Sequence, residues 1–423
     1  MGRTNDFSVK SWVETPANSD FPLQNLPFGV ISVNGETVNA SRIGDTAINL
    51  NALHTKGFFS GINLPEGVFN NDTLNAFIKL NKAVWSAVRA RLFDLFSEGN
   101  TEINDADKSA ILSPLANCEE KLPVFVGDYT DFYSSKEHAT NVGTMFRDPA
   151  NALLPNWLHI PVGYHGRASS IITTNQSVHR PLGQTKPSEE EPPVFGPSRL
   201  VDFELEMAFI TSEGKALGQR ISTAEAEDYI FGLVVFNDWS ARDIQKWEYV
   251  PLGPFLAKNF ASSISPWIVT LEALEPFRCA GPDQSEPKIL PYLEFAGDKS
   301  YDIHLQAGIE PEGKEETVVS NSNFKYMYWS MVQQLAHHTV NGCNINAGDM
   351  MGSGTISGPT PSSYGSMLEI AWRGTKPVQM NDGSERKFIQ DNDTVIMRGF
   401  CEKDGNRLGF GEVRTKLLPA LEF

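Results

Sequence analysis

Cysteine is scarce in this sequence of 423 residues, and the few cysteines lie far apart. The four are Cys118, Cys279, Cys343 and Cys401. None belongs to a CxxC pair, so the sequence predicts neither a zinc ribbon nor a disulfide framework. Because disulfides persist mainly in oxidising compartments, this cysteine usage fits a reducing compartment best.

Long apolar runs and an excess of positive charge are also missing. No apolar run approaches ~18 residues, the length that an ordinary membrane-spanning helix needs. Residues 1 to 20 contain no apolar stretch typical of a signal peptide, so we expect a cytoplasmic protein. The formal net charge of −17 argues against nucleic acid or an anionic membrane as a partner. An anionic substrate would therefore need a pocket with local positive charge.

Turn and strand residues are abundant. The chain has 34 glycines, 26 prolines and 26 phenylalanines, which predicts a mainly β fold rather than a helical bundle. Its length favours two domains over one core. A polar segment at residues 98–107 and a new apolar pattern from Leu122 place the boundary near residue 118. We therefore expect domains at residues 1–118 and 119–423.

The N-terminal part predicts a small barrel and one long helix. Residues 29–33 and 36–38 flank Asn34-Gly35, a strong signal for a β-hairpin, and a further short strand is expected at residues 47–50. Asp72 can cap a helix whose apolar residues recur every three or four positions. These residues are Leu74, Phe77, Leu80, Val84, Trp85, Val88, Leu92 and Leu95. The helix carries no chemistry and is expected to serve packing.

Residues 201–210 alternate apolar and polar, which predicts a half-buried β-strand. Asp202, Glu204 and Glu206 fall on one face. The Cα atoms of Glu204 and Glu206 would lie roughly 6.8 Å apart, and two carboxylates so close repel unless a cation or proton lies between them. The strand is therefore a candidate seat for a hard divalent ion. The alternative is a solvated face of an edge strand.

Four acids in different segments can supply an oxygen-only ion site. They are Asp131, Glu204, Glu206 and Asp238. Such a site needs several carboxylates from different elements, because Ca²⁺ takes roughly six to eight oxygens and Mg²⁺ about six. Asp131 could instead be a turn residue and Asp238 a helix N-cap.

His138 is the candidate general base, because imidazole titrates near neutral pH. It could also be a surface histidine. Glu369 interrupts an apolar segment, residues 367–372, that we expect to be a strand, and a buried carboxylate there would need a partner such as a histidine. His337 and His338 end a helix predicted over residues 324–338, where a capping role is expected.

Three cations lie in segments rich in aromatic residues and glycine. Arg147, Arg242 and Lys258 have the pattern of an anion pocket rather than of a solvated face. Arg242 and Gln245, three positions apart at the start of a predicted helix, could both point at one oxygen. The alternative for this pair is an ordinary helix surface.

Several long segments closely resemble the fumarylacetoacetase family. The clearest are residues 127–138, which contain GDYTDFY, and residues 237–245, NDWSARDIQ. Residues 20–27, 157–167, 203–208 and 354–358 resemble the family as well. The likeness covers nearly the whole chain.

The resemblance implies a fold and an activity. The fold is an N-terminal SH3-like barrel followed by a C-terminal mixed β-sandwich roll, in a cytosolic homodimer. The activity is hydrolysis of a carbon–carbon bond in 4-fumarylacetoacetate, an anionic diketo acid, to fumarate and acetoacetate, the last step of tyrosine and phenylalanine breakdown. Ca²⁺ and Mg²⁺ are the implied cofactors.

Matching positions carry the family's functional residues onto this chain. The matched Ca²⁺ ligands are Asp131, Glu204, Glu206 and Asp238. A second cation is implied near Asp238, Lys258 and Ser262, where Ala261-Ser262 replaces the expected Gly-Thr. The matched catalytic groups are His138 as base, Glu369 as its support, and Arg242, Gln245 and Lys258 at the oxyanion. The matched substrate contacts are Tyr133, Arg147, Tyr164, Gln245, Tyr249 and Thr355.

Three functions remain open on these residues. The first is the diketone hydrolase, in which His138 deprotonates water and a metal takes up the enolate charge. The second is a related enzyme for β-keto acids, such as an acylpyruvate hydrolase or an oxaloacetate decarboxylase, although these are usually shorter. The third is a Ca²⁺-stabilised binding module in which His138 is idle. Loss of fumarylacetoacetate absorbance with and without a chelator would separate them.

Overall fold

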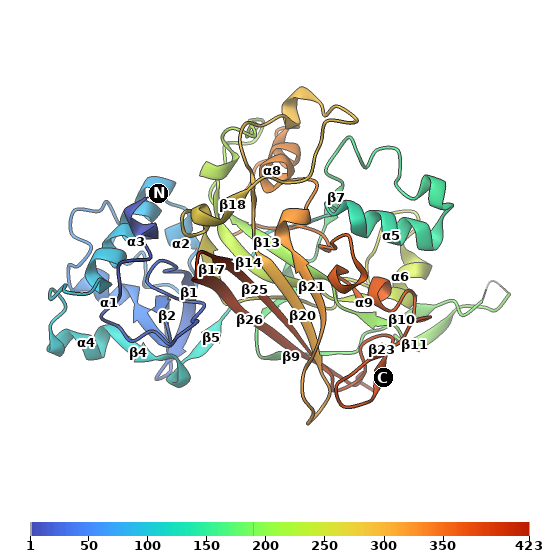
Figure 1. The fold of residues 1–423 in the computed structure, drawn as a ribbon, viewed down its shortest axis with the longest axis horizontal. Helices are drawn as coiled ribbons and strands as arrows, with labels where there is room; N and C mark the ends of the chain where they lie inside the picture. The colour runs from blue at the N-terminus through green and yellow to red at the C-terminus, as the bar shows by residue number, and fades with distance from the viewer. Residues whose placement is uncertain (1, 189, 423) are drawn as a thin grey trace.

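The structure, a computed structural model, describes residues 2–188 and 190–422. Figure 1 shows a blue N-terminal lobe beside a larger body built from long strands, with short helices around them. The fold is mixed α+β and mainly β, as the composition predicts. No helix in the part of the chain that the structure describes combines the length and apolar character needed to cross a membrane.

The predicted N-terminal hairpin is present. Asn34 and Gly35 have φ of 51° and 82°, the left-handed pair that a tight two-residue turn requires. The strand expected at residues 47–50 forms at residues 46–49. The strands of this lobe are β1 Phe28–Val33, β2 Glu36–Ile43, β3 Thr46–Asn49, β4 Leu112–Pro114 and β5 Glu119–Lys121.

The prediction of one long helix is wrong, because two helices occupy that segment. Asn81 is extended at φ −110° and its side chain accepts a hydrogen bond from Val84 N at 3.2 Å, so a new helix begins there. Asp72 caps neither helix. The helices of the lobe are α1 Leu50–Thr55, α2 Asn75–Ile78, α3 Lys82–Phe96 and α4 Asp105–Ile111.

One large sheet runs through both parts of the chain. Among the described residues it has thirteen strands, in the order β4-β3-β2-β1-β17-β14-β13-β22-β6-β7, with β5, β8 and β16 attached at its side. Its remaining strands are β6 Tyr129–Phe132, β7 Gly163–His165, β8 Ile171–Thr173, β13 Leu205–Thr211, β14 Ile230–Asp238, β16 Ser262–Ile264, β17 Trp267–Thr270 and β22 Met350–Gly352.

A second sheet packs against the first. It has the order β21-β20-β25-β26-β9, and Val235 of β14 shares a core with Leu305 of β20 and Met397 of β25. Its strands are β9 Gln176–His179, β20 His304–Glu310, β21 Thr317–Asn323, β25 Thr394–Lys403 and β26 Asn406–Leu418. The two-stranded pairs are β10 Leu182–Thr185 with β11 Val194–Pro197, β12 Val201–Asp202 with β15 Ser240–Ala241, β18 Arg278–Cys279 with β19 Ser300–Tyr301, and β23 Val378–Gln379 with β24 Glu385–Arg386.

The segment at residues 201–210 differs from the half-buried strand that its pattern predicts. It is split into β12 and β13, and both of its faces are buried. β13 lies between β14 and β22 in the large sheet, and the second sheet covers one side. The acids of this segment therefore lie inside the protein, which excludes a solvated edge strand.

The helices of the C-terminal part correct two further expectations. Residues 367–372 are not a strand, because α9 begins after Ser366, whose hydroxyl accepts a hydrogen bond from Glu369 N at 3.4 Å. The helix predicted over residues 324–338 is confined to α8, and a single 3-10 turn at residues 324–326 precedes it. The helices are α5 Lys136–Phe146, α6 Arg242–Glu248, α7 Leu271–Leu274, α8 Met331–Thr339 and α9 Met367–Ile370.

The N-terminal lobe shares a sheet and a core with the larger body. β1 pairs with β17 in antiparallel register, Phe28 opposite Ile268. The ring of Phe231 on β14 lies 5.5 Å from Phe28, 5.9 Å from Phe77 and 5.1 Å from Trp85, measured between centroids. The lobe therefore packs against β14, the strand that ends in Asp238. The boundary near residue 118 stays a prediction.

Replacing Phe231 with alanine should destabilise both parts of the molecule together. The side chain is 2% exposed, and deleting a buried phenylalanine costs about 3–5 kcal/mol in free energy of unfolding. We expect one thermal transition at lower temperature, measured by calorimetry. Phe125→Ala, at a position 69% exposed, is the control and should change the melting temperature little. Two separate transitions in the Phe231 variant would contradict a shared core.

Candidate active site

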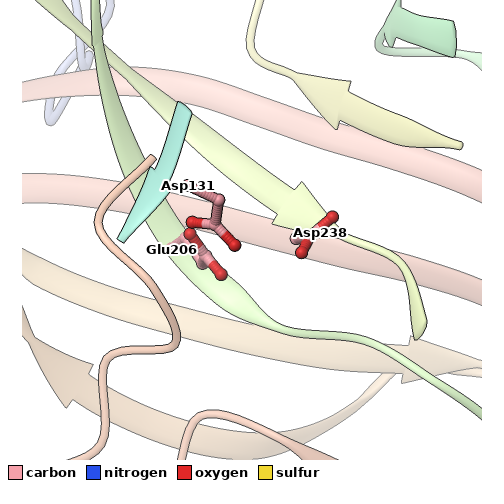
Figure 2. Close-up of side chains that lie close together, drawn as sticks. All are labelled: Asp131, Glu206 and Asp238. Atoms are coloured by element: carbon pink, nitrogen blue, oxygen red, sulfur yellow. The ribbon is translucent and has the colours of Figure 1, made fainter. Parts of the chain in front are cut away.

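Three carboxylates converge where strands of the large sheet end. Asp131 lies on β6, Glu206 on β13 and Asp238 at the end of β14, as Figure 2 shows. Each offers an oxygen, and these oxygens all lie within 4.8 Å of one another. Gly352 of β22 pairs in register with Asp131, and a Cβ there would lie 2.8 Å from Asp131 Oδ1. The glycine therefore leaves room for the acids.

The electrostatics of this group favour a bound cation. Burial raises the pKa of Asp131 and of Glu206 well above the ordinary values, and repulsion from Asp238 adds to both shifts. Burial also raises the pKa of Asp238. Asp131 Oδ1 and Glu206 Oε1 are buried and have no hydrogen-bond partner among the described residues. Unpartnered carboxylate oxygens that repel one another fit a hard divalent ion such as Ca²⁺ or Mg²⁺.

Glu204 lies beside this group but is held by cations. Its Oε1 accepts from Arg242 Nη2 at 2.8 Å, and its Oε2 accepts from Lys258 Nζ. Burial opposes its ionisation, but Arg242 and Lys258 overcome that cost, so the pKa of Glu204 is lowered. Its Oε1 is 4.0 Å from His138 Nε2. Glu204 therefore links the acids to the histidine and stands outside the group of three.

The residues predicted for a second cation gather at Asp238. Lys258 Nζ donates to Asp238 Oδ2, and Ser262 Oγ donates to Asp238 Oδ1 at 3.2 Å. Lys258 is 8% exposed, and although burial opposes its charge, Asp238 and Glu204 raise its pKa. The ammonium group therefore supplies fixed positive charge at the edge of the acid group.

His138 and Glu369 form the pair that the sequence predicts. His138 is in the first turn of α5, capped by Ser135, and its Nδ1 lies 2.7 Å from Glu369 Oε2. The histidine is 3% exposed, which excludes a surface role. Because Nδ1 faces a carboxylate, Nε2 is left as the proton acceptor on the side of Glu204.

A set of donors that the sequence analysis missed holds Glu369 in its charged form. Asn141 Nδ2 donates to Oε1 at 2.9 Å, Ser366 Oγ donates to Oε2 at 2.8 Å, and Ser357 Oγ lies 2.9 Å from both oxygens. Burial opposes the charge, but His138, Asn141 and Ser366 lower the pKa of Glu369. Asn141 lies one helical turn after His138, the only local signal that could have indicated it.

Replacing Glu369 with glutamine should lower kcat at least about 100-fold, because the amide cannot stabilise a charged imidazole or fix its tautomer. The lowered pKa gives a second readout. Ionised Glu369 stabilises the fold at pH above its ordinary value of 4.5, and this stability is lost as the pH falls through its lowered value. The melting temperatures of the two proteins should therefore differ at pH 7 and converge in acid. Unchanged turnover would contradict the pairing.

Arg242 has a side chain that is only 9% exposed and contacts several polar groups, so it is not part of an ordinary helix surface. It is the first residue of α6 and donates from Nε to Asp202 at 2.8 Å and from Nη1 to Gln245 Oε1 at 3.3 Å. Its contact with Glu204 completes the set. The predicted proximity of Arg242 and Gln245 is therefore present in the structure. Asp202 was placed on the acidic face by the sequence pattern but was given no role there.

Some of the predicted substrate contacts lie beside His138 and the three acids, and others lie at exposed positions. Tyr133 stacks edge-on against His138 with ring centroids 5.2 Å apart, and Tyr164 OH donates to Asp238 Oδ2 at 3.3 Å. Thr355 is buried beside Gly354, whose N–H donates to Glu206 Oε2 at 2.9 Å. Arg147 is exposed at the end of α5 and donates to Ala152 O.

Tyr249 is the outlier at the far end of α6, where its side chain is 54% exposed. The two adjacent histidines lie apart from His138. His338 Nε2 lies 3.1 Å from Thr130 Oγ1, and His337 Nδ1 lies 2.9 Å from Tyr292 OH. Burial lowers the pKa of both. These contacts join α8 to Thr130 and Tyr292, so the capping role expected for the two histidines stays a prediction.

Sequence comparison agrees with this geometry. A profile described as fumarylacetoacetate hydrolase C-terminal matches residues 128–417, and one described as fumarylacetoacetase N-terminal matches residues 24–123. The chain belongs to the fumarylacetoacetase family. Within the family it is 50% identical to the fumarylacetoacetase of Bos taurus over 98% of this chain and 100% of that protein. It is 51% identical to that of Dictyostelium discoideum over 97% of this chain and 98% of that protein.

Solved structures of lower identity share the fold of this family member. A fumarylacetoacetate hydrolase from Exiguobacterium antarcticum covers 93% of this chain and 99% of its own at 15% identity, with a TM-score of 0.51. A maleylpyruvate hydrolase from Sphingobium covers 93% of this chain and 100% of its own at 13% identity, with a TM-score of 0.50. At these identities the likeness shows the fold alone.

Proposed function

We propose that this chain hydrolyses a carbon–carbon bond of 4-fumarylacetoacetate, giving fumarate and acetoacetate, the last step of tyrosine and phenylalanine breakdown. The observation that carries the proposal is the His138–Glu369 pair set 4.0 Å from Glu204, beside the buried acid group. Fumarylacetoacetases about 50% identical over nearly the full chain support it. A buried base next to a cation site suits hydrolysis of a diketone.

Asp131, Glu206 and Asp238, with Glu204 beside them, would hold Ca²⁺, and Mg²⁺ is proposed near Asp238, Lys258 and Ser262. A divalent ion there supplies positive charge for the diketone oxygens and for the enolate. The all-oxygen, mutually repelling donor set supports this assignment.

His138 begins the reaction as general base. Its Nε2 takes a proton from water while Glu369 stabilises the imidazolium through Nδ1, and the hydroxide oxygen bonds to the ketone carbon. Positioned bases of this kind contribute about 10²- to 10⁴-fold. The imidazolium can then return the proton to the carbanion carbon of the leaving acetoacetate, so that the electrons of the broken bond end in a C–H bond.

Arg242, Gln245 and Lys258 stabilise the oxyanion that forms when water adds. Arg242 is fixed by Asp202 and Glu204, so its charge is oriented before substrate arrives. The tetrahedral intermediate then collapses, the carbon–carbon bond breaks, and fumarate leaves as a carboxylate. The proposed substrate contacts are Tyr133, Arg147, Tyr164, Gln245, Tyr249 and Thr355.

Replacing Gln245 with methionine should lower kcat by about 10²- to 10³-fold, because one oxyanion donor is lost while the shape of the side chain is kept. Steady-state kinetics on fumarylacetoacetate provide the measurement. Gln379, an exposed residue that donates to Glu385, offers the control Gln379→Met, which should leave kcat unchanged. If the two variants have equal kcat, Gln245 is not an oxyanion donor.

The function is tested by following fumarylacetoacetate absorbance with the purified chain, with and without a chelator. We expect cleavage to fumarate and acetoacetate that stops in chelator. An acylpyruvate and oxaloacetate are the comparison substrates. Faster turnover of either, or no turnover of all three, would refute the proposed function.

Three finer proposals accompany this function. The N-terminal lobe is proposed to be an SH3-like barrel, supported by its antiparallel β1 to β5 strands. The protein is proposed to be a homodimer in the cytoplasm. Exposed apolar side chains between Trp247 and Leu256 support a partner surface, and the four unpaired cysteines support a reducing compartment.

A further inference from the structure

Asp202 is the acid of the 201–210 segment that lies outside the proposed cation sites. It ends β12, opposite Ser240 of β15, and has no exposed surface. It therefore cannot contact substrate. A carboxylate buried this completely is costly unless donors surround it. The identity of those donors indicates what Asp202 does.

Three donors converge on the two oxygens of Asp202. Arg242 Nε donates to Oδ2 at 2.8 Å, and Leu368 N donates to the same oxygen at 3.0 Å. Met367 N donates to Oδ1 at 2.8 Å. Both carboxylate oxygens of Asp202 are therefore occupied as acceptors, by one guanidinium N–H and by two backbone N–H groups.

The donors belong to two separate parts of the catalytic apparatus. Arg242 is the proposed oxyanion group, and Asp202 fixes the Nε side of its guanidinium while Glu204 fixes Nη2. Met367 and Leu368 are the first two residues of α9, and the third is Glu369, which holds His138. One carboxylate therefore anchors the oxyanion group and the support of the base.

We propose that Asp202 is a positioning residue that sets the placement of Arg242 and of the Glu369–His138 pair together. The inference rests on the proposed function. Misplacing reacting groups by about 1 Å can cost on the order of 100-fold in rate, so a shared anchor has a large kinetic effect without touching substrate. The shared anchor also fixes the position of the base relative to the oxyanion group.

Asparagine at this position tests the proposal with little change of shape. The asparagine amide has a single acceptor oxygen, so its NH₂ group must replace one of the two carboxylate oxygens. The NH₂ group would then face Arg242 Nε or a backbone N–H of α9, and two donors that face each other cannot form a hydrogen bond. Asp202→Asn should lower kcat by about 100-fold, with KM changed less than about threefold, because the affected groups act on bond breaking. Loss of affinity alone would overturn the proposal.

Asp393 supplies a matched control. It is 1% exposed and accepts from Arg386 Nε and Nη2, both at 2.8 Å, and from Gln390 N at 2.9 Å. It is thus another buried aspartate that joins an arginine to a backbone N–H, and neither Arg386 nor Gln390 belongs to α6 or α9. Asp393→Asn should lower the melting temperature but leave kcat per folded site unchanged. Equal kcat losses in both variants would indicate a merely structural role for Asp202.

Double variants show whether Asp202 acts through its two partners. The kcat losses from Asp202→Asn and Arg242→Lys should be less than multiplicative when combined, and the same holds for Asp202→Asn with Glu369→Gln. Fully multiplicative losses in both pairs would overturn the proposal. If Asp202→Asn does not fold, Asp202→Glu keeps the charge and moves it by one methylene, and the same kcat loss is expected.

A spectroscopic readout separates this inference from the proposed function. The low-field proton signal of His138 Nδ1–H, assigned by its loss in Glu369→Gln, should shift or broaden in Asp202→Asn and stay unchanged in Asp393→Asn. This holds whether or not the wild-type chain cleaves fumarylacetoacetate. An inactive wild-type chain refutes the proposed function, whereas an unmoved signal in Asp202→Asn refutes the positioning role.

Discussion

Alanine in place of His138 should lower kcat on fumarylacetoacetate by up to about 10⁴-fold, the full contribution of a positioned general base. The imidazole is the group whose Nε2 is free to accept a proton, since Nδ1 is bound to Glu369. Steady-state kinetics at saturating Ca²⁺ measure the effect. Ca²⁺ binding, followed by calorimetry, should stay intact because His138 lies outside the group of three acids.

His337→Ala is the control for this variant. His337 is also a histidine bonded to a neighbouring side chain, Tyr292, but it lies at the end of α8. We expect near-normal kcat in the control. A kcat of the His138→Ala protein within about tenfold of the wild-type kcat would contradict the assignment of His138 as the general base.

Removing divalent ions with a chelator should abolish turnover, and added Ca²⁺ or Mg²⁺ should restore it. The acids of the site repel one another without a cation, and the enolate charge would have no counter-ion. The measurement is turnover against free Ca²⁺ set by a chelator buffer. Full activity at the lowest free ion concentrations would refute the metal assignment.

Stability offers an independent test of the same site. Burial and repulsion raise the pKa of Asp131 and Glu206 above their ordinary values of 3.8 and 4.5. Groups with raised values stabilise the fold at low pH, and this stability is lost as the pH rises through the raised values. The chelated protein should therefore melt at lower temperature at pH 8 than at pH 5, and Ca²⁺ should remove most of this difference.

Asp131→Asn sharpens the stability test. Loss of one negative charge should weaken Ca²⁺ binding and turnover yet raise the melting temperature of the chelated protein at pH 8. This opposite movement of activity and stability distinguishes a metal site from a structural acid cluster. A chelated variant that melts below the chelated wild type would contradict the repulsion.

Local signals predicted much of the strand content correctly. Asn34-Gly35 sets the first hairpin because both residues accept the left-handed conformation. The short strand expected at residues 47–50 is present as β3, one residue earlier. Such features depend on a few adjacent residues, so the sequence pattern is sufficient to find them.

Segments whose local pattern fits two structures were predicted less well. The apolar stretch at residues 367–372 suits a strand or a helix by composition. A hydrogen bond that Met367 N donates to Asp202 Oδ1, 165 positions away, favours the helical turn. The apolar period from Leu74 to Leu95 continues through the break at Asn81, because α2 and α3 pack on the same core.

In the candidate site, too, some features follow from the local sequence pattern and others do not. The pattern placed Glu204 and Glu206 on one face, and both are buried. It could not show that the strand is interrupted at Phe203 and that Glu204 forms an isolated antiparallel β-bridge with Ser366. Glu204 therefore turns to Arg242 and Lys258, while Glu206 joins Asp131 and Asp238.

Residue types and short-range spacing were enough to identify a mainly β protein with a base, an anion pocket and a set of acids for a hard cation. The partners of each acid depended on strand register and on contacts between residues more than a hundred positions apart. The cost of burying charge explains why those contacts decide: inside the protein, a carboxylate must find a cation, a metal or a set of N–H donors. Which of these it finds is a property of the folded chain.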